Sequence, residues 1–257
     1  MKVTAKKHLG QHFLTNENIA SKIVEGLSFS GYYTVLEVGP GMGVLTKYLL
    51  QKEQDIFVAE IDQESVAYLK LHYPKLEDHI LNDFLKLNIE NQFQGKEIAV
   101  IGNFPYNISS QILFKIVDNY LLIPEMAGMF QKEVAERTAA VPRTKDYGIL
   151  SVLVQAYYDV KYLFTVHENV FNPPPKVKSG VIRLTRNPKP GLSGNEALFR
   201  QIVKSGFNQR RKTLRNSWKS LGIPEALKEH EFMNKRAEEL SVEDFIHITQ
   251  LWKEALQ

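Results

Sequence analysis

The sequence predicts an α/β fold in which a parallel sheet is followed by a small C-terminal helical domain. Short, β-branched apolar segments such as 33–38 and 98–101 alternate with helical segments through most of the chain, as in strand–helix–strand units. Beyond the linker Pro188-Lys189-Pro190-Gly191, only helical spacing continues. We therefore expect two domains, residues 1–187 and residues 188–257.

The first predicted strand runs directly into the turn Gly39-Pro40-Gly41-Met42-Gly43 and then into a helix over 44–51. Glycines let a backbone approach a ligand closely, and a helix amino terminus offers free N–H groups. A nicotinamide-type G-x-G-x-x-G would need glycine at position 44, which is Val44. The observed Glu-x-Gly-x-Gly-x-Gly instead resembles the first motif of S-adenosylmethionine-dependent methyltransferases, with Gly39 and Gly41 as candidate cofactor contacts.

Acidic side chains end the next two predicted strands. Glu60 follows the segment 55–59, where a carboxylate can accept hydrogen bonds from both ribose hydroxyls of a nucleoside. Asp62 is the alternative at this strand end, and we expect it to be an exposed cap of the following helix. Asp83 ends the third strand, where it can accept from an adenine amino group or, equally, cap a helix.

The fourth strand, 98–101, delivers Gly102-Asn103-Phe104-Pro105-Tyr106 to the carboxyl edge of the sheet, where open α/β sheets bind their ligands. The Asn103 amide, the Pro105 ring without a backbone donor and the Tyr106 ring suit a flat base that carries an amino group. The alternative is an ordinary strand-to-helix turn. Because ligand-binding side chains follow three neighbouring strands, the binding interpretation is favoured.

The later part of the α/β domain contains a loop and a closing strand pair. Residues 141–148 are rich in turn-forming residues and are expected to be mobile, whereas 161–166 and 177–184 read as antiparallel strands. Three prolines after Asn172 stiffen the chain, so Phe171 is held in place as a packing residue or as a stacking surface for a base. Helices beyond the linker are predicted over 196–207, 210–220, 235–240 and 241–256.

Composition excludes several kinds of site. The 257 residues include no cysteine, so disulfides and thiolate metal ligands are excluded, and no His-rich spacing indicates a metal site. No apolar stretch approaches the ~18 residues of a membrane span, and the basic amino terminus lacks the apolar core of a signal peptide. We therefore expect a cytoplasmic protein that binds no membrane.

Positive charge is concentrated in two runs, although the formal net charge is only +3. Residues 186–222 contain nine Lys and Arg side chains against one acid, and residues 1–22 contain four against one. Such segregation indicates binding of a nucleic acid; the alternative is a solvated helix face. The candidate RNA contacts are Arg210, Arg211, Lys212 and Arg215. They cannot all face one side of a helix, so some are expected to pack locally.

Taken in order, the motifs resemble those of the ribosomal RNA adenine dimethyltransferase family, and in particular its bacterial small-subunit members. The motifs are Leu9-Gly10-Gln11-His12-Phe13-Leu14, Glu37 to Gly43, Glu60, Asn82-Asp83, Asn103-Phe104-Pro105-Tyr106, Tyr147-Gly148-x-Leu150-Ser151, Phe171-x-Pro-Pro-Pro-Lys-Val-x-Ser179 and Phe207-x-x-Arg210-Arg211-Lys212-Thr213-Leu214-Arg215-Asn216. None is decisive alone, but the ordered set covers nearly the whole chain and is highly specific. The resemblance implies a Rossmann-like class I S-adenosylmethionine-dependent methyltransferase fold.

The resemblance also implies a reaction, which is dimethylation on exocyclic nitrogen of two adjacent adenines near the 3′ end of small-subunit rRNA. S-adenosylmethionine would be the methyl donor, and we expect a monomer that acts on an assembling small subunit. The implied cofactor contacts are His12, Leu14, Gly39, Glu60, Asp83 and Asn103. His12 stands where the family usually has Asn, and Phe104 where it usually has Leu. An imidazole can donate one hydrogen bond as an amide does, so His12 is kept as a contact.

Orientation of the acceptor amine is the expected basis of catalysis. The adenine amino nitrogen is a poor nucleophile because its lone pair is delocalised into the ring. The side-chain oxygen of Asn103 and a main-chain carbonyl at Phe104-Pro105 are expected to accept its two N–H bonds and to aim the lone pair at the methyl group. Tyr106 and Phe171 would hold the flipped-out base between them, and no general base is needed.

Three other functions share parts of this pattern. A large-subunit rRNA adenine methyltransferase of the antibiotic-resistance type has the same fold and the same kind of tetrad as Asn103-Phe104-Pro105-Tyr106. The proline-rich segment after Phe171 and the basic run after Phe207 favour the small-subunit family. A non-catalytic RNA-binding or ribosome assembly factor is disfavoured by the intact Glu60, Asp83 and Asn103. A DNA adenine methyltransferase usually has a second proline where Phe104 stands.

Overall fold

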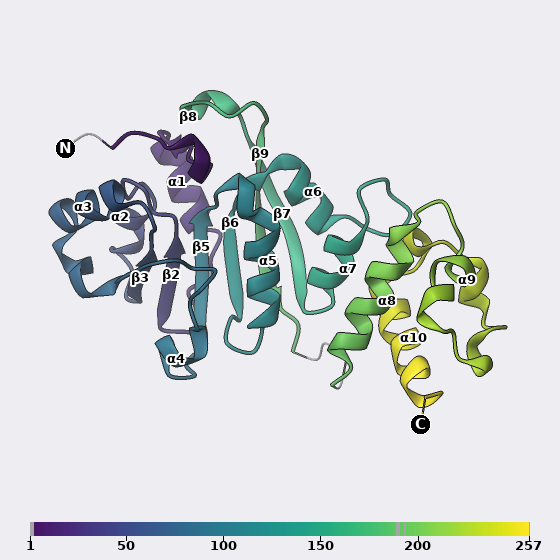
Figure 1. The fold of residues 1–257 in the computed structure, drawn as a ribbon. Helices are drawn as coiled ribbons and strands as arrows, with labels where there is room; N and C mark the ends of the chain where they lie inside the picture. Colours follow the sequence, from purple (N-terminus) through teal and green to yellow (C-terminus); the bar gives the residue numbers. More distant parts are fainter. Residues whose placement is uncertain (1–2, 189–190, 193, 257) are drawn as a thin grey trace. The chain divides into compact units, whose positions relative to one another are not determined.

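A seven-stranded sheet carries the candidate site (Figure 1), in the order β4-β3-β2-β5-β6-β9-β7. The computed structural model describes residues 3–188, 191–192 and 194–256, so Lys189 and Pro190 of the predicted linker lie outside the described residues. The strands are β2 (Thr34–Val38), β3 (Asp55–Ala59), β4 (Ile80–Leu81), β5 (Ile98–Asn103), β6 (Glu125–Gln131), β7 (Tyr158–Val166) and β9 (Ser179–Arg186). The strands from β2 to β6 are parallel where they pair, and β9 runs antiparallel to β6. The predicted α/β class is therefore confirmed.

The strand order reverses at β2, which lies between β3 and β5. Val38 is paired with Ala59 on one side, and Glu37 is paired with Ile101 on the other. Connections leave the sheet in opposite directions at such a switch point and open a crevice at the carboxyl ends of the strands. The register therefore brings the residues that follow β2, β3 and β5 to one edge.

Burial on both faces explains the apolar composition of the central strands. Val35, Leu36, Val58, Ile98 and Val100 have no exposed surface, as expected for parallel strands covered by helices. The helices of this region are α1 (Glu17–Val24), α2 (Thr46–Leu49), α3 (Gln63–His72), α4 (Ile89–Phe93), α5 (Ser109–Asp118) and α6 (Lys132–Ala139). Figure 1 shows α5 in front of the sheet. No described helix has both the length and the apolar character that a membrane span requires.

Polar residues begin several of these helices. The Asn16 side chain accepts a hydrogen bond from the Ile19 N–H at the start of α1, and Asp62 accepts from the Glu64 N–H at the start of α3. Such caps satisfy N–H groups that have no partner inside the helix. Asp62 does cap α3 as predicted, but it is buried, 2% exposed, and not an exposed residue.

A second, two-stranded sheet joins two segments that are distant in sequence. Strand β1 (Phe13–Leu14) pairs antiparallel with β8 (Phe171–Asn172), in the register Phe13↔Asn172 and Leu14↔Phe171. The sequence predicts no strand at either place, because two residues are too few to show a periodicity. This pair brings residues 3–15, which we call the N-terminal segment, beside residues 170–177, which we call the proline-rich segment.

Other predicted elements are shorter than their patterns suggest. The helix over 44–51 is reduced to α2, because turns occupy the residues before Thr46. In the tail, the predicted helix over 210–220 contains only α9 (Leu214–Ser217) and a 3₁₀ turn, and 235–240 contains the 3₁₀ turn Ala237–Glu239. Boundaries are the least certain part of such predictions because local turns compete with helix at each end.

The chain divides into two compact units. The first comprises Met1–Ala135 and Val160–Arg186, and the second comprises Glu136–Asp159 and Asn187–Gln257. The second unit thus begins again at residue 187, next to the expected domain boundary, but it also takes in residues 136–159. Helix α7 (Ile149–Gln155) explains this, since its apolar residues contact α8 (Glu196–Asn208) and α10 (Val242–Glu254).

The second unit has its own core. Trp218 is fully buried, donates from its indole N–H to the Ile202 carbonyl at 2.9 Å, and meets Trp252 edge-on with ring centroids 5.6 Å apart. Helix α10 starts at a reciprocal capping box, in which Ser241 and Asp244 each accept from the other's main-chain N–H.

Candidate active site

The glycine turn after β2 forms one wall of the site because it leaves no room for side chains. Gly41 and Gly43 have positive φ angles of 55° and 81°, a conformation that glycine adopts without strain. A Cβ atom at Gly41 would lie 2.9 Å from the Phe13 ring, and one at Gly43 would lie 2.5 Å from the Tyr73 ring. The turn thus exposes main-chain atoms to the crevice.

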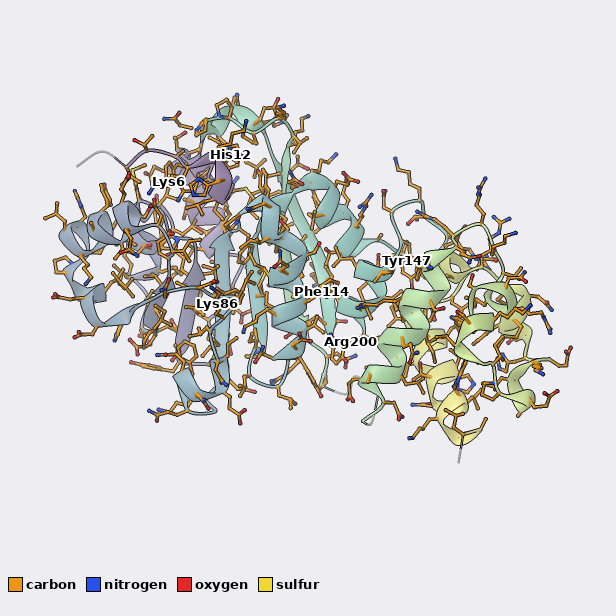
Figure 2. All side chains as sticks on the ribbon, in the orientation of Figure 1. Lys6, His12, Lys86, Phe114, Tyr147 and Arg200 are labelled. Carbon is orange, nitrogen blue, oxygen red and sulfur yellow. The ribbon has the colours of Figure 1, made fainter. Side chains whose placement is uncertain are left out.

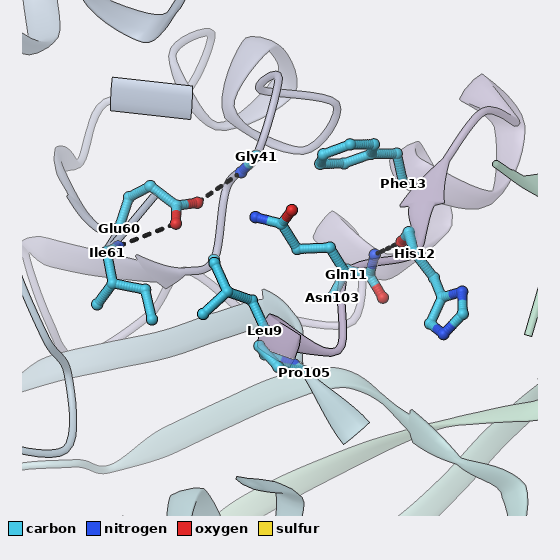
Figure 3. Close-up of a pocket in the computed structure, with 10 residues that line it drawn as sticks. Leu9, Gln11, His12, Phe13, Gly41, Glu60, Ile61, Asn103 and Pro105 are labelled. Atoms are coloured by element: carbon cyan, nitrogen blue, oxygen red, sulfur yellow. Dashed lines mark hydrogen bonds between the residues drawn. The ribbon is translucent and has the colours of Figure 1, made fainter. Parts of the chain in front are cut away.

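Glu60 lies directly opposite this turn. Its carboxylate accepts hydrogen bonds from the main-chain N–H groups of Gly41 at 3.1 Å, Ile61 at 2.9 Å and Asp62 at 2.9 Å, and Figure 3 shows the first two of these bonds. The residue is 6% exposed. Burial raises the pKa of Glu60, and the three N–H groups act in the opposite direction. The main chain therefore fixes the direction of this carboxylate.

Asn103 ends β5 on the other side of the crevice. Its amide Nδ2 donates to the main-chain carbonyl of His12 at 2.9 Å (Figure 3). Because a carbonyl can only accept, this bond assigns the amide orientation and leaves Oδ1 available as an acceptor. The N-terminal segment thus orients the side chain that the sequence identifies as the key acceptor-binding group.

Two adjoining cavities make up the crevice between Glu60 and Asn103, and we call them together the donor cleft. Gly39, Gly41, Phe13 and Asn103 line both cavities. The remaining lining residues are Leu9, Gln11, His12, Glu60, Ile61 and Pro105 in one cavity, and Leu14, Glu37, Pro40, Met42, Val44 and Leu45 in the other. Of the predicted cofactor residues, all but Asp83 therefore line the donor cleft.

Asp83 belongs to the same sheet edge but is otherwise engaged. It follows β4, and the Glu60 N–H donates to the Leu81 carbonyl at 3.0 Å, which joins the ends of β3 and β4. Its Oδ1 accepts from the Leu85 N–H at 2.9 Å, and the Lys86 amine lies 3.6 Å from Oδ2. The side chain thus caps the turn over 84–86 and not a helix, because the next helix, α4, begins at Ile89 with Asn88 as its cap. The role of Asp83 as an adenine contact stays a prediction.

The rest of the tetrad is held by packing. Phe104 is 1% exposed and stacks on Phe130 with ring centroids 4.7 Å apart. The Tyr106 hydroxyl makes a 2.5 Å hydrogen bond with the Ser179 hydroxyl, and burial raises the pKa of Tyr106. These contacts fix the Phe104 and Tyr106 rings, so residues 103–106 are held by tertiary packing, which an ordinary strand-to-helix turn does not require.

A larger cavity of about 780 Å³ adjoins the donor cleft, and we call it the acceptor cavity. Gln11 and His12 line both spaces. The other residues that line the acceptor cavity are Ala5, Lys7, Gly10, Tyr106, Asn107, Gln131, Pro173, Pro174, Pro175, Lys176 and Val177. An aromatic ring, a stiff proline wall and two lysines suit a base on a phosphate backbone.

Phe171 is not among the residues that line the acceptor cavity. It is 4% exposed and packs in the apolar core with Leu14, while its backbone pairs with β1. The prediction that its ring stacks on a base is therefore not supported in this conformation, because the ring is enclosed by core side chains. Its burial matches the packing alternative.

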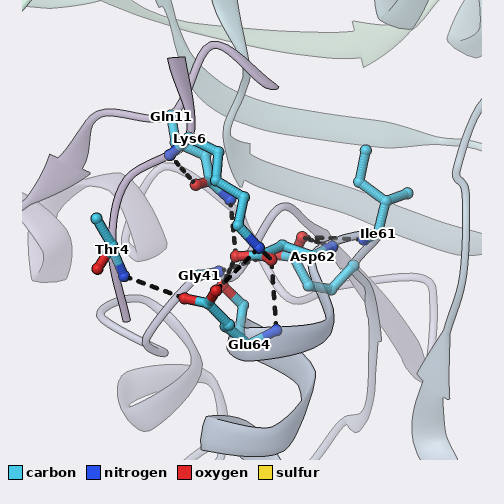
Figure 4. A network of polar contacts seen from close by, with 9 residues as sticks. Thr4, Lys6, Gln11, Gly41, Ile61, Asp62 and Glu64 are labelled. Carbon is cyan, nitrogen blue, oxygen red and sulfur yellow. Dashed lines mark hydrogen bonds and ion pairs between the residues drawn. The ribbon is translucent and has the colours of Figure 1, made fainter. Parts of the chain in front are cut away.

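The N-terminal segment is anchored across the donor cleft by contacts that the sequence does not reveal. The Lys6 amine pairs with the buried Asp62 carboxylate and lies 3.4 Å from Glu64, as Figure 4 shows. Gln11 donates to Asp62 at 3.3 Å and accepts from the Lys6 N–H at 2.8 Å. Figure 2 shows Lys6 and His12 on this segment. In the sequence, the only indication of this anchored segment is the motif Leu9 to Leu14, which resembles that of the dimethyltransferase family.

Glu37 is a second residue to which the sequence assigns no role. It lines the donor cleft from β2, is 1% exposed, and accepts a hydrogen bond from the Thr46 hydroxyl at 2.6 Å. Burial raises the pKa of Glu37 to about 8. Its position as the first letter of the Glu-x-Gly-x-Gly-x-Gly motif was the available signal.

The four candidate RNA contacts separate into two pairs. The Arg210 guanidinium donates to the Lys145 carbonyl at 2.6 Å, and Arg215 lies 3.4 Å from Glu229. Arg211 and Lys212 are exposed. Arg210 is also exposed but holds the loop 141–148, which is predicted to be mobile. Within the described residues, Arg211 and Lys212 differ from this pair in making no ion pair or side-chain hydrogen bond.

No metal site accompanies these residues within the described part of the chain, where no group of three or more His, Asp or Glu side chains could hold an ion. The fold and the donor cleft define a class of protein, the class I S-adenosylmethionine-dependent methyltransferases. A solved dimethyladenosine transferase from Plasmodium falciparum is similar with a TM-score of 0.83 and 25% identity, covering 95% of this chain and 98% of that one. The 23S rRNA methyltransferase ErmE shares the fold with a TM-score of 0.71 at 24% identity, covering 94% and 99%.

Sequence comparison narrows the class to a family. The family model described as "Ribosomal RNA adenine dimethylase" matches residues 2–254. Proteins named "Ribosomal RNA small subunit methyltransferase A" are 59% identical in Flavobacterium johnsoniae, over 97% of this chain and 96% of that protein, and 57% identical in Bacteroides thetaiotaomicron, over 99% and 96%. The chain belongs to the ribosomal RNA adenine dimethylase family, which confirms the predicted family and fold.

Proposed function

We propose that this protein dimethylates the exocyclic nitrogen of two adjacent adenines near the 3′ end of small-subunit rRNA, with S-adenosylmethionine as methyl donor. The observation that carries the proposal is the fixed Asn103 amide, which lines the donor cleft and is bonded to His12, a residue that lines the acceptor cavity as well. Its Nδ2 is committed to the His12 carbonyl at 2.9 Å, so its Oδ1 can accept from an amino group. Relatives that are 59% and 57% identical carry the small-subunit methyltransferase name.

The donor cleft fits the nucleoside part of S-adenosylmethionine. The glycine turn removes the side chains that would fill the crevice, and Glu60 directs a carboxylate into it, as needed to accept from ribose hydroxyls. When bound, the cofactor supplies an electrophilic methyl group on its sulfonium. Leu14 and Gly39 line the cleft as apolar and main-chain contacts.

The acceptor cavity fits an unpaired adenine. Tyr106 offers a ring held by its hydrogen bond to Ser179, and a base stacked on an aromatic ring gains about 1–3 kcal/mol. Asn103 Oδ1 and the main-chain carbonyl at Phe104-Pro105 then accept the two N–H bonds, which localises the nitrogen lone pair. The proton that is lost after methyl transfer needs no dedicated base, since the alkylated nitrogen is strongly acidic.

Charge supports an RNA partner in the second unit as well. Arg211 and Lys212 are exposed there, and RNA affinity rises as phosphates are neutralised. Proteins read structured RNA largely by shape and by unpaired loops. We therefore propose an assembling small subunit in the cytoplasm as the substrate, met by a monomer of this chain.

Methylation mapping tests the proposal. The protein is incubated with labelled S-adenosylmethionine and undermethylated small or large ribosomal subunits, and the modified adenines are located. We expect two dimethylated neighbouring adenines near the 3′ end of the small-subunit rRNA. Label confined to the large subunit would indicate the antibiotic-resistance activity, and binding without label would indicate a non-catalytic assembly factor.

A further inference from the structure

His12 makes its side-chain contacts on the acceptor side of the site. Its Nδ1 lies 2.8 Å from the Pro173 carbonyl, and Figure 3 shows the imidazole directed away from Glu60 and Gly41. Since a carbonyl only accepts, Nδ1 carries the hydrogen, and in the neutral ring Nε2 is an acceptor. Within the described residues, Nε2 has no hydrogen-bond partner.

The imidazole is also packed against the ring that we assign to base stacking. The His12 and Tyr106 ring centroids are 5.4 Å apart and the planes are inclined by 30°. Both rings line the acceptor cavity together with Pro173. By contrast, the main-chain carbonyl of His12 holds Asn103 at the donor cleft. One residue thus serves the two spaces with different atoms.

We propose that the His12 side chain binds the acceptor nucleotide and not the methyl donor. The imidazole is fixed by Pro173 and Tyr106, and its Nε2 accepts a hydrogen bond from an N–H or O–H group of the incoming nucleotide. This inference rests on the proposed function and reassigns a residue that the family resemblance places among the cofactor contacts. An Asn side chain could donate a hydrogen bond to the Pro173 carbonyl, but it has no ring to pack against Tyr106.

Two substitutions separate the packing of the His12 ring from the hydrogen bonds of its two nitrogens. His12→Asn keeps a donor for the Pro173 carbonyl and removes the ring, whereas His12→Phe keeps a ring and removes both nitrogens. Neither alters the main-chain carbonyl that holds Asn103. Thr15→Val is the matched control, because it removes another hydrogen bond between the same segments, from the Thr15 hydroxyl to the Val170 carbonyl at 2.9 Å, away from the acceptor cavity.

The experiment measures the dissociation constant for S-adenosylmethionine, and KM and kcat on undermethylated small subunits, for the wild type and the three variants. Loss of one hydrogen bond or ring contact is expected to raise KM for the subunit about 3- to 10-fold in both His12 variants. The dissociation constant of the donor should change less than about twofold, and Thr15→Val should resemble the wild type.

Three results would overturn the inference. They are a rise in the donor dissociation constant that parallels KM, a His12→Asn variant with wild-type KM, and a Thr15→Val variant that reproduces the His12 effects. These results require an active wild type, so they leave the proposed function standing. A wild type that leaves small-subunit adenines unmethylated overturns the proposed function, and this inference with it.

Discussion

The donor cleft and the acceptor cavity adjoin each other but are built in different ways. The cleft lies at the ends of β2, β3 and β5, where Glu60 is fixed by three N–H groups, and side chains of the N-terminal segment such as Phe13 line it as well. The cavity is formed by side chains of the N-terminal and proline-rich segments, and lysines lie along it. The donor side is thus built on the fixed ends of the sheet strands, and the acceptor side is wider and carries Lys7 and Lys176.

This difference separates the chemistry of the two ligands. A small nucleoside donor is held by the Glu60 side chain and by main chain, whose positions the sheet determines. A large polyanion needs an open, basic wall that can admit a base. Variants on the two sides should therefore affect different measured constants.

The largest effect is expected for Phe171→Ala, which tests whether the ring belongs to the core or to the acceptor cavity. Truncating a buried Phe lowers the free energy of unfolding by about 3–5 kcal/mol, measurable by urea denaturation. Tyr106→Ala should mainly raise KM for the small subunit. Phe171→Leu serves as the control and should restore most of the stability. A stable Phe171→Ala protein with a raised KM would show that the ring stacks on the base.

Asn103→Ala should slow methyl transfer from the bound donor to the acceptor base much more than it weakens donor binding. Loss of a preorganised hydrogen-bonding group at the reacting atom slows the chemical step about 100- to 1,000-fold, while donor binding survives at reduced affinity. Single-turnover methyl transfer and calorimetric donor binding measure the two effects. Asn119→Ala, which loses a bond to the Lys115 carbonyl at 2.8 Å and lines neither the donor cleft nor the acceptor cavity, should stay active. Near-normal turnover of Asn103→Ala would remove Asn103 from the mechanism.

Glu60→Gln should affect the donor side alone. The amide has one acceptor oxygen in place of the two that receive N–H groups from Gly41, Ile61 and Asp62. Loss of hydrogen bonds to a charged group weakens donor binding about 10- to 100-fold. KM for the small subunit at saturating donor should stay unchanged, and Glu90→Gln, on helix α4 away from the cleft, is the control. A parallel rise in KM would show that the two sides are coupled.

Glu37 should make the stability of the donor side depend on pH. Burial raises its pKa from the ordinary 4.5 to about 8 in the folded protein, so the folded state keeps a proton that the unfolded chain loses. The free energy of unfolding therefore falls as the pH rises from 4.5 towards 8, by at most about 1.4 kcal/mol per pH unit. Denaturation of Glu37→Gln across this range should lack the fall. An unchanged pH profile in that variant would assign the dependence to another group.

The smallest effect is expected for the charges of the second unit. Replacing Arg211 and Lys212 by Ala should reduce the slope of log affinity against log salt by about one for each phosphate that is no longer neutralised. Lys228→Ala removes a charge that pairs with Glu225 at 2.5 Å and should leave the slope unchanged. Equal slopes in all variants would show that Arg211 and Lys212 are solvated surface residues that do not contact RNA phosphates.

Sequence patterns predicted the donor cleft far better than the acceptor cavity. Gly39, Glu60 and Asn103 each lie at or just past the end of a strand, so local order in the chain places them at one sheet edge. His12, Lys6 and Phe171 reach their positions through contacts with residues far along the chain, which periodicity does not show. Arg210 likewise reads as an RNA contact by charge alone, while its bond to Lys145 depends on tertiary structure.

The bond between His12 and Pro173 joins residues 161 positions apart, which has a consequence for the order of folding. During synthesis the N-terminal segment leaves the ribosome first, and its partners Asp62 and Asn103 follow well before the proline-rich segment does. Contacts of such separation form late because a long loop must close. The donor cleft can therefore be complete while the acceptor cavity is still unformed. Native-state hydrogen exchange should find the Thr15 N–H, bound to the Val170 carbonyl at 2.8 Å, less protected than the amides of β2.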